Sequence, residues 1–179
     1  MPDAASAAHR HAFLYTNGAL ANLGTLNGGT QSFAYALNDA AQVVGASNGS
    51  GAAPLHAVLF NAGTVTDLNP VLASSTTSNA YAINAGGDFA GAFRDSTTSF
   101  HAYRRLAASG IVTDLGTFGG TTSQAYGINA SGDVTGFAHT PSQDAHAFRY
   151  GNAGLVDLWN ARRQHERGTQ HRSERSRRR

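Results

Sequence analysis

The sequence predicts an all-β fold, built from tandem four-stranded antiparallel units. Short apolar runs are separated along the chain by clusters of glycine, asparagine, threonine and serine, a spacing typical of strands joined by turns. The whole pattern recurs with a period of about 45 residues. No window carries a sustained apolar period of about 3.6 residues, so we expect little helix.

A His–Ala pair opens each unit. The histidines of these pairs are His11, His56, His101 and His146. They divide a predicted repeat array at residues 9–158 into units of about 11–55, 56–100 and 101–145 and a partial unit at 146–158. Each unit predicts four strands, because turn residues divide the chain between consecutive histidines into four short runs.

Turn chemistry sets the limits of these strands. In the first unit His11–Tyr15 alternates as a strand does, and Asn17 with Gly18 supplies a hairpin turn that accepts positive φ. The third and fourth strands of each unit flank a second tight turn. The repeated asparagines of that turn and the repeated glycines of the fourth strand are Asn38, Asn84, Asn129, Gly45, Gly91 and Gly136.

Both faces of such a unit are apolar or small, so neighbouring units must cover them. On one predicted strand, Tyr35 and Leu37 face one side and the alternating alanines face the other. Four strands in about 45 residues are typical of a propeller blade, and we predict a partial β-propeller. The narrow strand at Val43–Ala46 would lie nearest the axis. A β-solenoid is the alternative.

Several repeated polar and aromatic residues are candidates for a site. For the four histidines, hydrogen bonds that tie each strand to a neighbouring loop are favoured over a ring of metal ligands. The tyrosines recur at one point of the unit, and we expect them in the core because they alternate with alanines, although aromatic platforms for sugars are the alternative. These tyrosines are Tyr35, Tyr81 and Tyr126.

Two sets of aspartates recur as well. The first set lies in or beside the asparagine turns, at Asp39, Asp88 and Asp133. Each such turn supplies too few oxygens for calcium, so a turn-forming role is predicted. The second set precedes a leucine in the second strand, at Asp67, Asp114 and Asp157. There, capping a loop is favoured over general-base chemistry.

Three sub-motifs recur in one order along the chain. They are His-Ala-Phe at 11–13 and 146–148, Asp-Leu-Gly-Thr-Phe-Gly-Gly-Thr at 114–121, and the Ile-Asn-x-x-Gly-Asp-Val-x-Gly pattern at 128–136. They resemble the bacterial HAF-repeat family, described as extracellular repeat proteins, over about residues 9–158. The second unit departs from the pattern at Asn69 and Pro70, where the others have Gly-Thr. The resemblance implies export, a repeat array and no assigned catalysis, and it provides no catalytic residues.

Other chemistries lack their residue patterns. The chain has no cysteine, which excludes disulfides and cysteine-based zinc sites. The glycine pairs at 28–29 and 119–120 are not followed by a helix pattern, so no phosphate loop is indicated. We therefore expect no enzymatic activity and no cofactor. No apolar stretch approaches the roughly 20 residues of a membrane span, and the N-terminus has no apolar segment of a signal peptide.

The ends of the chain differ from the array. Residues 1–8 are expected to be disordered. Residues 162–179 carry eight arginines against two glutamates, whereas residues 1–158 carry five arginines against nine aspartates. At Trp159 the repeat requires Gly-Thr-Leu-Gly-Gly, and a shift of one base in permitted codons restores that motif, so we expect 159–179 to be a disordered tail translated out of frame. On this view the chain is a piece of a longer repeat protein. A basic tail for nucleic acid or membrane surfaces is the alternative.

Two functions follow from this pattern. The first is a non-catalytic, exported structural or protein-interaction module, and the second is a cell-surface repeat that binds carbohydrate or another polymer. Loops rich in glycine, threonine and serine favour the first. The partner would be a protein or a surface polymer, with no nucleic acid expected. Self-association through unclosed blade faces is also expected, because an array of three units and a strand pair cannot close a ring.

Overall fold

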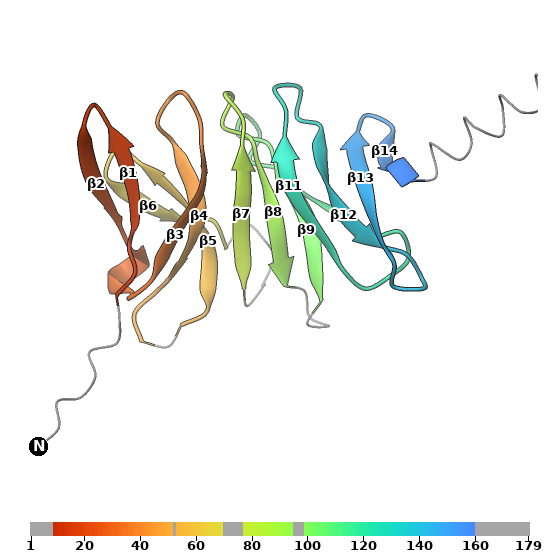
Figure 1. The fold of residues 1–179 in the computed structure, drawn as a ribbon, viewed down its shortest axis with the longest axis horizontal. Coiled ribbons are helices and arrows are strands. Elements are labelled where there is room, and N and C mark those ends of the chain that lie inside the picture. The colour runs from red at the N-terminus through yellow and green to blue at the C-terminus, as the bar shows by residue number, and fades with distance from the viewer. Residues whose placement is uncertain (1–8, 52, 70–76, 95–98, 160–179) are drawn as a thin grey trace, which may run out of the picture.

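The computed structural model describes residues 9–51, 53–69, 77–94 and 99–159. Within these residues the strands form one two-stranded sheet and three four-stranded sheets, all antiparallel. The sheets stand side by side in chain order (Figure 1). The prediction of an all-β fold with tandem four-stranded sheets is confirmed.

The strands are short, and each sheet takes its strands in chain order. The two-stranded sheet contains β1 (Ala12–Thr16) and β2 (Ala19–Gly24), and a 3₁₀ turn, η1 (Leu26–Gly28), follows it. The first complete sheet contains β3 (Ser32–Leu37), β4 (Val43–Asn48), β5 (Leu55–Asn61) and β6 (Thr64–Asp67). The second contains β7 (Ser78–Ile83), β8 (Phe89–Arg94), β9 (Phe100–Arg105) and β10 (Val112–Gly116). The third contains β11 (Ser123–Ile128), β12 (Val134–His139), β13 (Ala145–Gly151) and β14 (Gly154–Asp157).

The sheets are two strands out of phase with the predicted units. Each sheet begins with the third strand of one unit and ends with the second strand of the next. Residues 146–158, predicted as a partial unit, therefore complete the third sheet, and the leftover strand pair is β1–β2 at the other end. The physical reason is that a periodic sequence marks no starting strand, whereas in the structure the chain passes to the next sheet after β2, β6 and β10.

The core lies between consecutive sheets. One apolar cluster joins the β1–β2 pair to the first complete sheet, a second joins the first and second complete sheets, and a third joins the second and third. Small alanines on one sheet lie in the same cluster as larger side chains on the next, as Ala57 of β5 does with Tyr103 of β9. Each sheet is thus stabilised mainly by its neighbours, which is the energetics of a repeat array.

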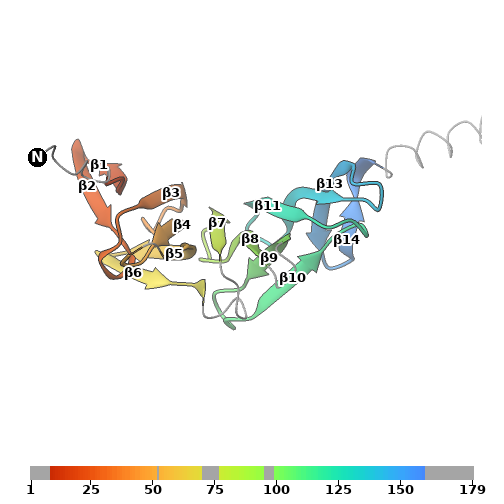
Figure 2. The ribbon, with the colours of Figure 1, turned by 90° about the horizontal axis from the view of Figure 1, so that it is seen from below.

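The first strands of the sheets, β3, β7 and β11, lie along the inner side of a curved, open array (Figure 2). The fan of separate antiparallel sheets matches part of a propeller and excludes the solenoid alternative. The strand at Val43–Ala46 is not innermost as predicted, because β4 lies between β3 and β5. Its glycine is needed for a close approach, since a β-carbon on Gly45 would overlap the carbonyl oxygen of Phe33 on β3.

Both predicted ends of the chain fall largely outside the described residues. This applies to residues 1–8 and to residues 160–179 of the predicted tail. Trp159 is described, and its ring lies 5.9 Å from that of His146. Among the described residues, no helix has both the length and the apolar character that crossing a membrane requires.

Candidate interaction surface

The repeat histidines occupy equivalent places, one per sheet: His56, His101 and His146 lie on β5, β9 and β13, and His11 lies just before β1. Each Nδ1 bonds to a side chain of the strand that follows in the chain: Asn22 for His11 at 2.9 Å, Asp67 for His56 at 3.0 Å, Asp114 for His101 at 2.9 Å and Asp157 for His146 at 2.9 Å. In each pair, Oδ1 of the Asn or Asp partner accepts the backbone N–H two residues on. The same Asn or Asp side chain therefore caps the end of its strand and holds the histidine ring in place.

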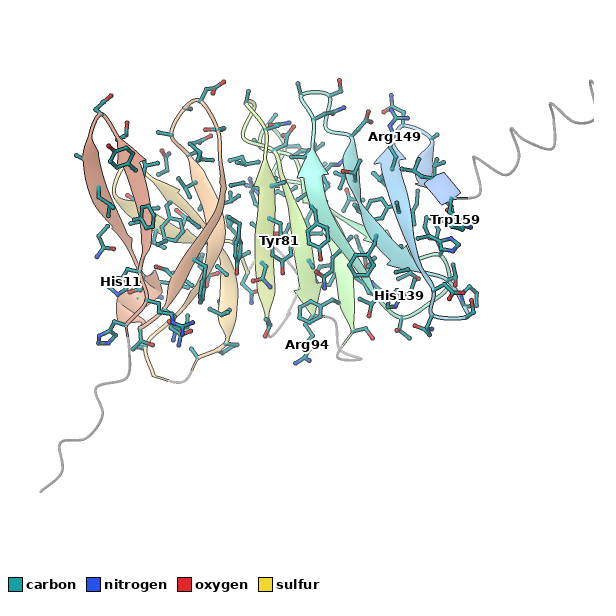
Figure 3. The ribbon with its side chains drawn as sticks, in the orientation of Figure 1. His11, Tyr81, Arg94, His139, Arg149 and Trp159 are labelled. Atoms are coloured by element: carbon teal, nitrogen blue, oxygen red, sulfur yellow. The ribbon has the colours of Figure 1, made fainter. Side chains whose placement is uncertain are left out.

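This pairing is a structural link between two strands of one sheet. Sequence reasoning gave the aspartates a capping role and the histidines hydrogen bonds to a loop, but it did not pair the two, although the spacing of 11 residues recurs in three of the four pairs. Among the described residues, no three His, Asp or Glu side chains gather closely enough to hold a metal ion. Figure 3 shows His11 at the lower edge of the array, where β1 begins.

A buried serine straps each sheet to the preceding one. The Oγ atoms of Ser32, Ser78 and Ser123 each accept the backbone N–H of the alanine after a repeat histidine, at 2.9 Å in all three cases. Each hydroxyl also donates to an oxygen at or just after the end of the last strand of the preceding sheet: Gly24 O, Asn69 Oδ1 and Gly116 O. Sequence reasoning missed these serines, and the available signal was their recurrence at the first residue of β3, β7 and β11.

The turn asparagines form a second link between sheets. Asn38 Nδ2 donates to the carbonyl oxygen of Asn84 at 3.0 Å, and Asn84 Nδ2 donates to that of Asn129 at 2.9 Å. Each Oδ1 meanwhile accepts backbone N–H groups of its own turn. The amides therefore run in one direction along the array, each sheet donating to the next.

A row of aromatic rings lines the inner side of the array. The rings of Tyr35 and Tyr81 lie 5.2 Å apart, and those of Tyr81 and Tyr126 lie 5.4 Å apart. The expected core position is wrong, because Tyr35 is 44% and Tyr126 53% exposed. Each tyrosine is the extra residue of a β-bulge on the first strand, which turns it out of the alternating pattern. Burial nevertheless raises the pKa of Tyr81 to about 12.

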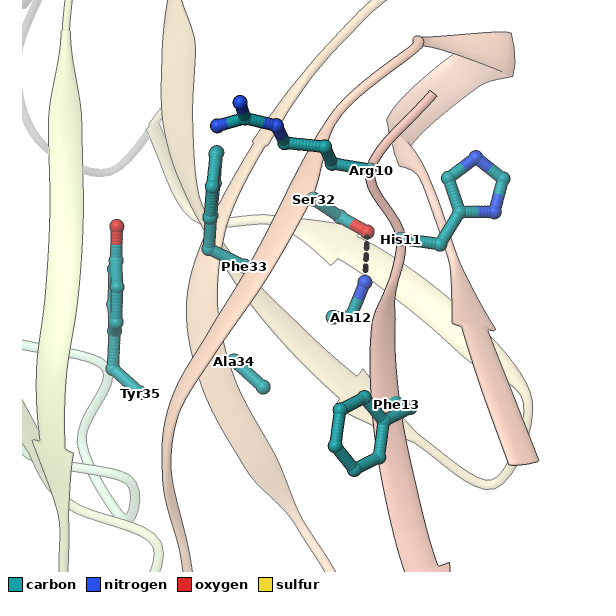
Figure 4. Close-up of a pocket in the computed structure, with 8 residues that line it drawn as sticks. All are labelled: Arg10, His11, Ala12, Phe13, Ser32, Phe33, Ala34 and Tyr35. Carbon is teal, nitrogen blue, oxygen red and sulfur yellow. Dashed lines mark hydrogen bonds between the residues drawn. The ribbon is translucent and has the colours of Figure 1, made fainter. Parts of the chain in front are cut away.

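The N-terminal end of the array exposes apolar side chains. Phe13 on β1 is 56% exposed, whereas the equivalent Val58, Tyr103 and Phe148 are all 0% exposed. Tyr15 of the same strand is 66% exposed. A groove of about 360 Å³ runs between β1 and β3, bordered by residues 10–13 and 32–35 (Figure 4).

The C-terminal end carries an ion pair, and it also exposes the apolar side chains of Leu158 and Trp159. Arg149 donates to Asp133 Oδ2 at 2.7 Å, and this hydrogen bond holds the pKa of the Asp133 carboxyl below its usual range. Ala147 is exposed, although the equivalent Ala12, Ala57 and Ala102 are buried beneath a following sheet. Both ends of the described array thus present contact positions that the inner sheets fill.

Comparison with known proteins adds no family to this picture. No protein-family model matches the chain, and no curated protein matches it either.

Proposed function

We propose that this chain is a non-catalytic structural and protein-interaction module of an exported repeat protein. The supporting observation is the contrast between inner and outer sheets. A serine strap crosses each of the three junctions between described sheets, whereas Ala147 and Phe13 are exposed at the ends. The likeness of the motifs to extracellular HAF repeats supports the exported setting.

The module works by presenting sheet faces and edges to a partner. An exposed apolar face beside an unpaired strand edge favours association, because both the apolar surface and the open backbone groups gain partners. The relevant surface is the face of β1–β2, with Phe13, Tyr15 and Leu20 all more than half exposed. The other end, where Arg149 and Asp133 pair with each other and Ala147 is exposed, presents a different surface.

Light scattering tests this proposal on the chain itself. We expect the average mass to rise with concentration, and a Phe13→Asp variant to remain monomeric over the same range because a charge would be buried in the contact. Arg94→Asp, a charge change on another sheet, is the control and should associate as the parent does. A single monomeric mass for the parent chain at every concentration would refute the proposal.

Binding of an extended polymer is the second candidate, and the aromatic row favours it. Tyr35, Tyr81 and Tyr126 form a continuous strip of rings along the inner side of the array, and two of them are about half exposed. Such a strip suits apolar sugar faces or other extended chains. A glycan array with the parent chain and Tyr126→Ala is the test: retained glycans that the variant loses support this role, and identical profiles exclude it.

A further inference from the structure

The open edge of β1 has a filled counterpart in every other described sheet. The strands β5, β9 and β13 are equivalent to β1, and each pairs on its inner side with the second strand of its sheet over six positions. In the part of the chain that the structure describes, β1 pairs with β2 alone, and Arg10, just before β1, forms a parallel bridge with Gln31. The sheet therefore lacks the two inner strands that would make it equivalent to the others.

The backbone of β1 is oriented for such a partner. On β5, Ala57 accepts the N–H of Leu68 on the outer side, so the next residue, Val58, faces the inner strand. By the same alternation, Phe13 and Tyr15 present their N–H and C=O groups to the open edge. Ala12 is already bonded to Ser32, as its equivalents are in the other sheets. This edge is therefore aligned for antiparallel addition of one strand.

The side chain of Phe13 shows what the added strand must contain. Its equivalent Tyr103 lies across the neighbouring strand, with ring centroids 6.1 Å from Phe89 and 6.2 Å from Phe93, and its hydroxyl donates to Asn79 O at 3.1 Å on the strand beyond. The residue paired with Tyr103 is Gly91. An aromatic ring can cross there because the glycine has no side chain.

The groove beside β1 lies where this partner would sit. It is bordered by residues 10–13, of which Phe13 faces the edge, and by Phe33, Ala34 and Tyr35 of β3 (Figure 4). In the inner sheets, the first strand of the next sheet packs against the second and third strands of the preceding one, as β7 does against β4 and β5. The strand β3 already occupies that position beside β1, so one wall of the site is in place.

From this geometry we infer that the β1 edge is a docking site for a β-hairpin with the repeat's own pattern, Ser-x-Ala-Tyr followed by an Asn–Gly–Asp turn and a strand with a central glycine. The inference rests on the proposed interaction role and names its partner. The best-matched hairpin is Ser123–His139, because its own partner strand β13 carries the His-Ala-Phe motif that also begins β1. Phe13 would then lie over the glycine equivalent to Gly136.

Fluorescence anisotropy with a labelled synthetic peptide of residues 123–139 and the full chain tests this inference. We expect saturable one-to-one binding, weakened at least about tenfold by Phe13→Ala, since burial of a phenylalanine ring is lost. Tyr126→Ala, which removes a comparably exposed ring from another sheet, should bind as the parent does. A Gly136→Val peptide should show no saturable binding, because a β-carbon at that position overlaps the carbonyl oxygen of Gln124.

Disulfide trapping tests the register without relying on affinity. The chain has no cysteine, so one introduced thiol has one partner. Thr135 pairs with Arg149, the equivalent of Leu14, and a Thr135→Cys peptide should therefore cross-link to a Leu14→Cys chain. A Phe137→Cys peptide, two residues out of register, should cross-link much less.

The outcomes separate the inference from the proposed function. Absence of saturable binding by the parent peptide, equal affinity for the Phe13→Ala chain, or equal cross-linking by both cysteine peptides overturns the hairpin site. If the chain still self-associates in light scattering, the interaction role stands with a different contact. If it stays monomeric and yet binds the hairpin in register, the docking site stands and self-association is excluded.

Discussion

Replacement of Ser123 by alanine removes one complete strap between two sheets. The Ser123 hydroxyl is 0% exposed, accepts the N–H of Ala102 at 2.9 Å and donates to Gly116 O at 2.6 Å. Alanine fits the same space, so the variant tests hydrogen bonding rather than packing. It leaves a buried N–H donor and a carbonyl acceptor without this partner.

The expected loss follows from these two groups. An unsatisfied buried donor costs about 1–3 kcal/mol, and an ordinary hydrogen bond contributes about 1 kcal/mol. We therefore expect Ser123→Ala to lower the free energy of unfolding by about 2–3 kcal/mol. For a chain of this size that corresponds to a decrease in the melting temperature of roughly 4–12 °C.

Thermal and urea unfolding followed by circular dichroism measure this effect. Ser131→Ala is the matched control, because Ser131 is exposed in a turn of the same sheet, and it should change stability by less than about 0.5 kcal/mol. Hydrogen exchange adds a local measurement, since the Ala102 amide should lose protection in the Ser123 variant. If both serine variants melt at the same temperature as the parent, the strap does not stabilise the junction.

Three further changes have defined outcomes. Gly91→Ala places a β-carbon against a backbone carbonyl of β7 and should lower the free energy of unfolding by at least about 1–3 kcal/mol. Gly49→Ala has room for the β-carbon and should not lower it. Equal losses in chemical unfolding would contradict the close approach at Gly91. Asn84→Ala breaks the bond to the next sheet and should destabilise the chain by about 1–3 kcal/mol. The loss should exceed that of Asn129→Ala at the end of the described array. The reverse order in a urea titration would refute the amide link. Burial raises the pKa of Tyr81 from 10.0 to about 12, so its contribution to stability is complete below about pH 10 and is lost as the pH rises through 12. Tyr81→Phe should therefore move alkaline unfolding to higher pH. An unchanged unfolding midpoint by circular dichroism would contradict this.

The period of the sequence was sufficient to predict the sheets, because each repeat of turn residues and apolar runs produces the same four strands. The turn of Asn84 and its equivalents was recognised from composition for the same local reason. The start of each sheet was not predictable, since pairing across a loop is decided by which strands meet in space. The length of the loop before each His–Ala strand did not reveal that this strand pairs with the strand that precedes it in the chain, as β5 does with β4.

The aromatic row escaped prediction because one added residue reverses an alternating pattern. Tyr35 appeared to share a face with Leu37, and a bulge between Ala34 and Ala36 breaks that alternation. The bulge itself depends on Gly45 of the next strand, where the carbonyl of Phe33 approaches too closely for a side chain. Both partners repeat in the sequence, but their relation appears only when the two strands are paired.

The links between sheets give the array a direction. Each asparagine amide donates forward, from Asn38 to Asn84 and from Asn84 to Asn129, while each serine hydroxyl receives an N–H from the sheet before it. Asn84 Nδ2 also bonds to Asp88 within its own turn, and among the described residues Asn129 Nδ2 makes only this kind of bond, to Asp133 at 3.3 Å. A sheet added at the C-terminal end must supply a carbonyl to the Asn129 amide and a hydroxyl to Ala147, whereas a hairpin added at β1 must supply an edge and a glycine. The two ends therefore select different partners, and a second copy that keeps its own sheets intact meets the β1 end through the exposed face of Phe13 and Tyr15.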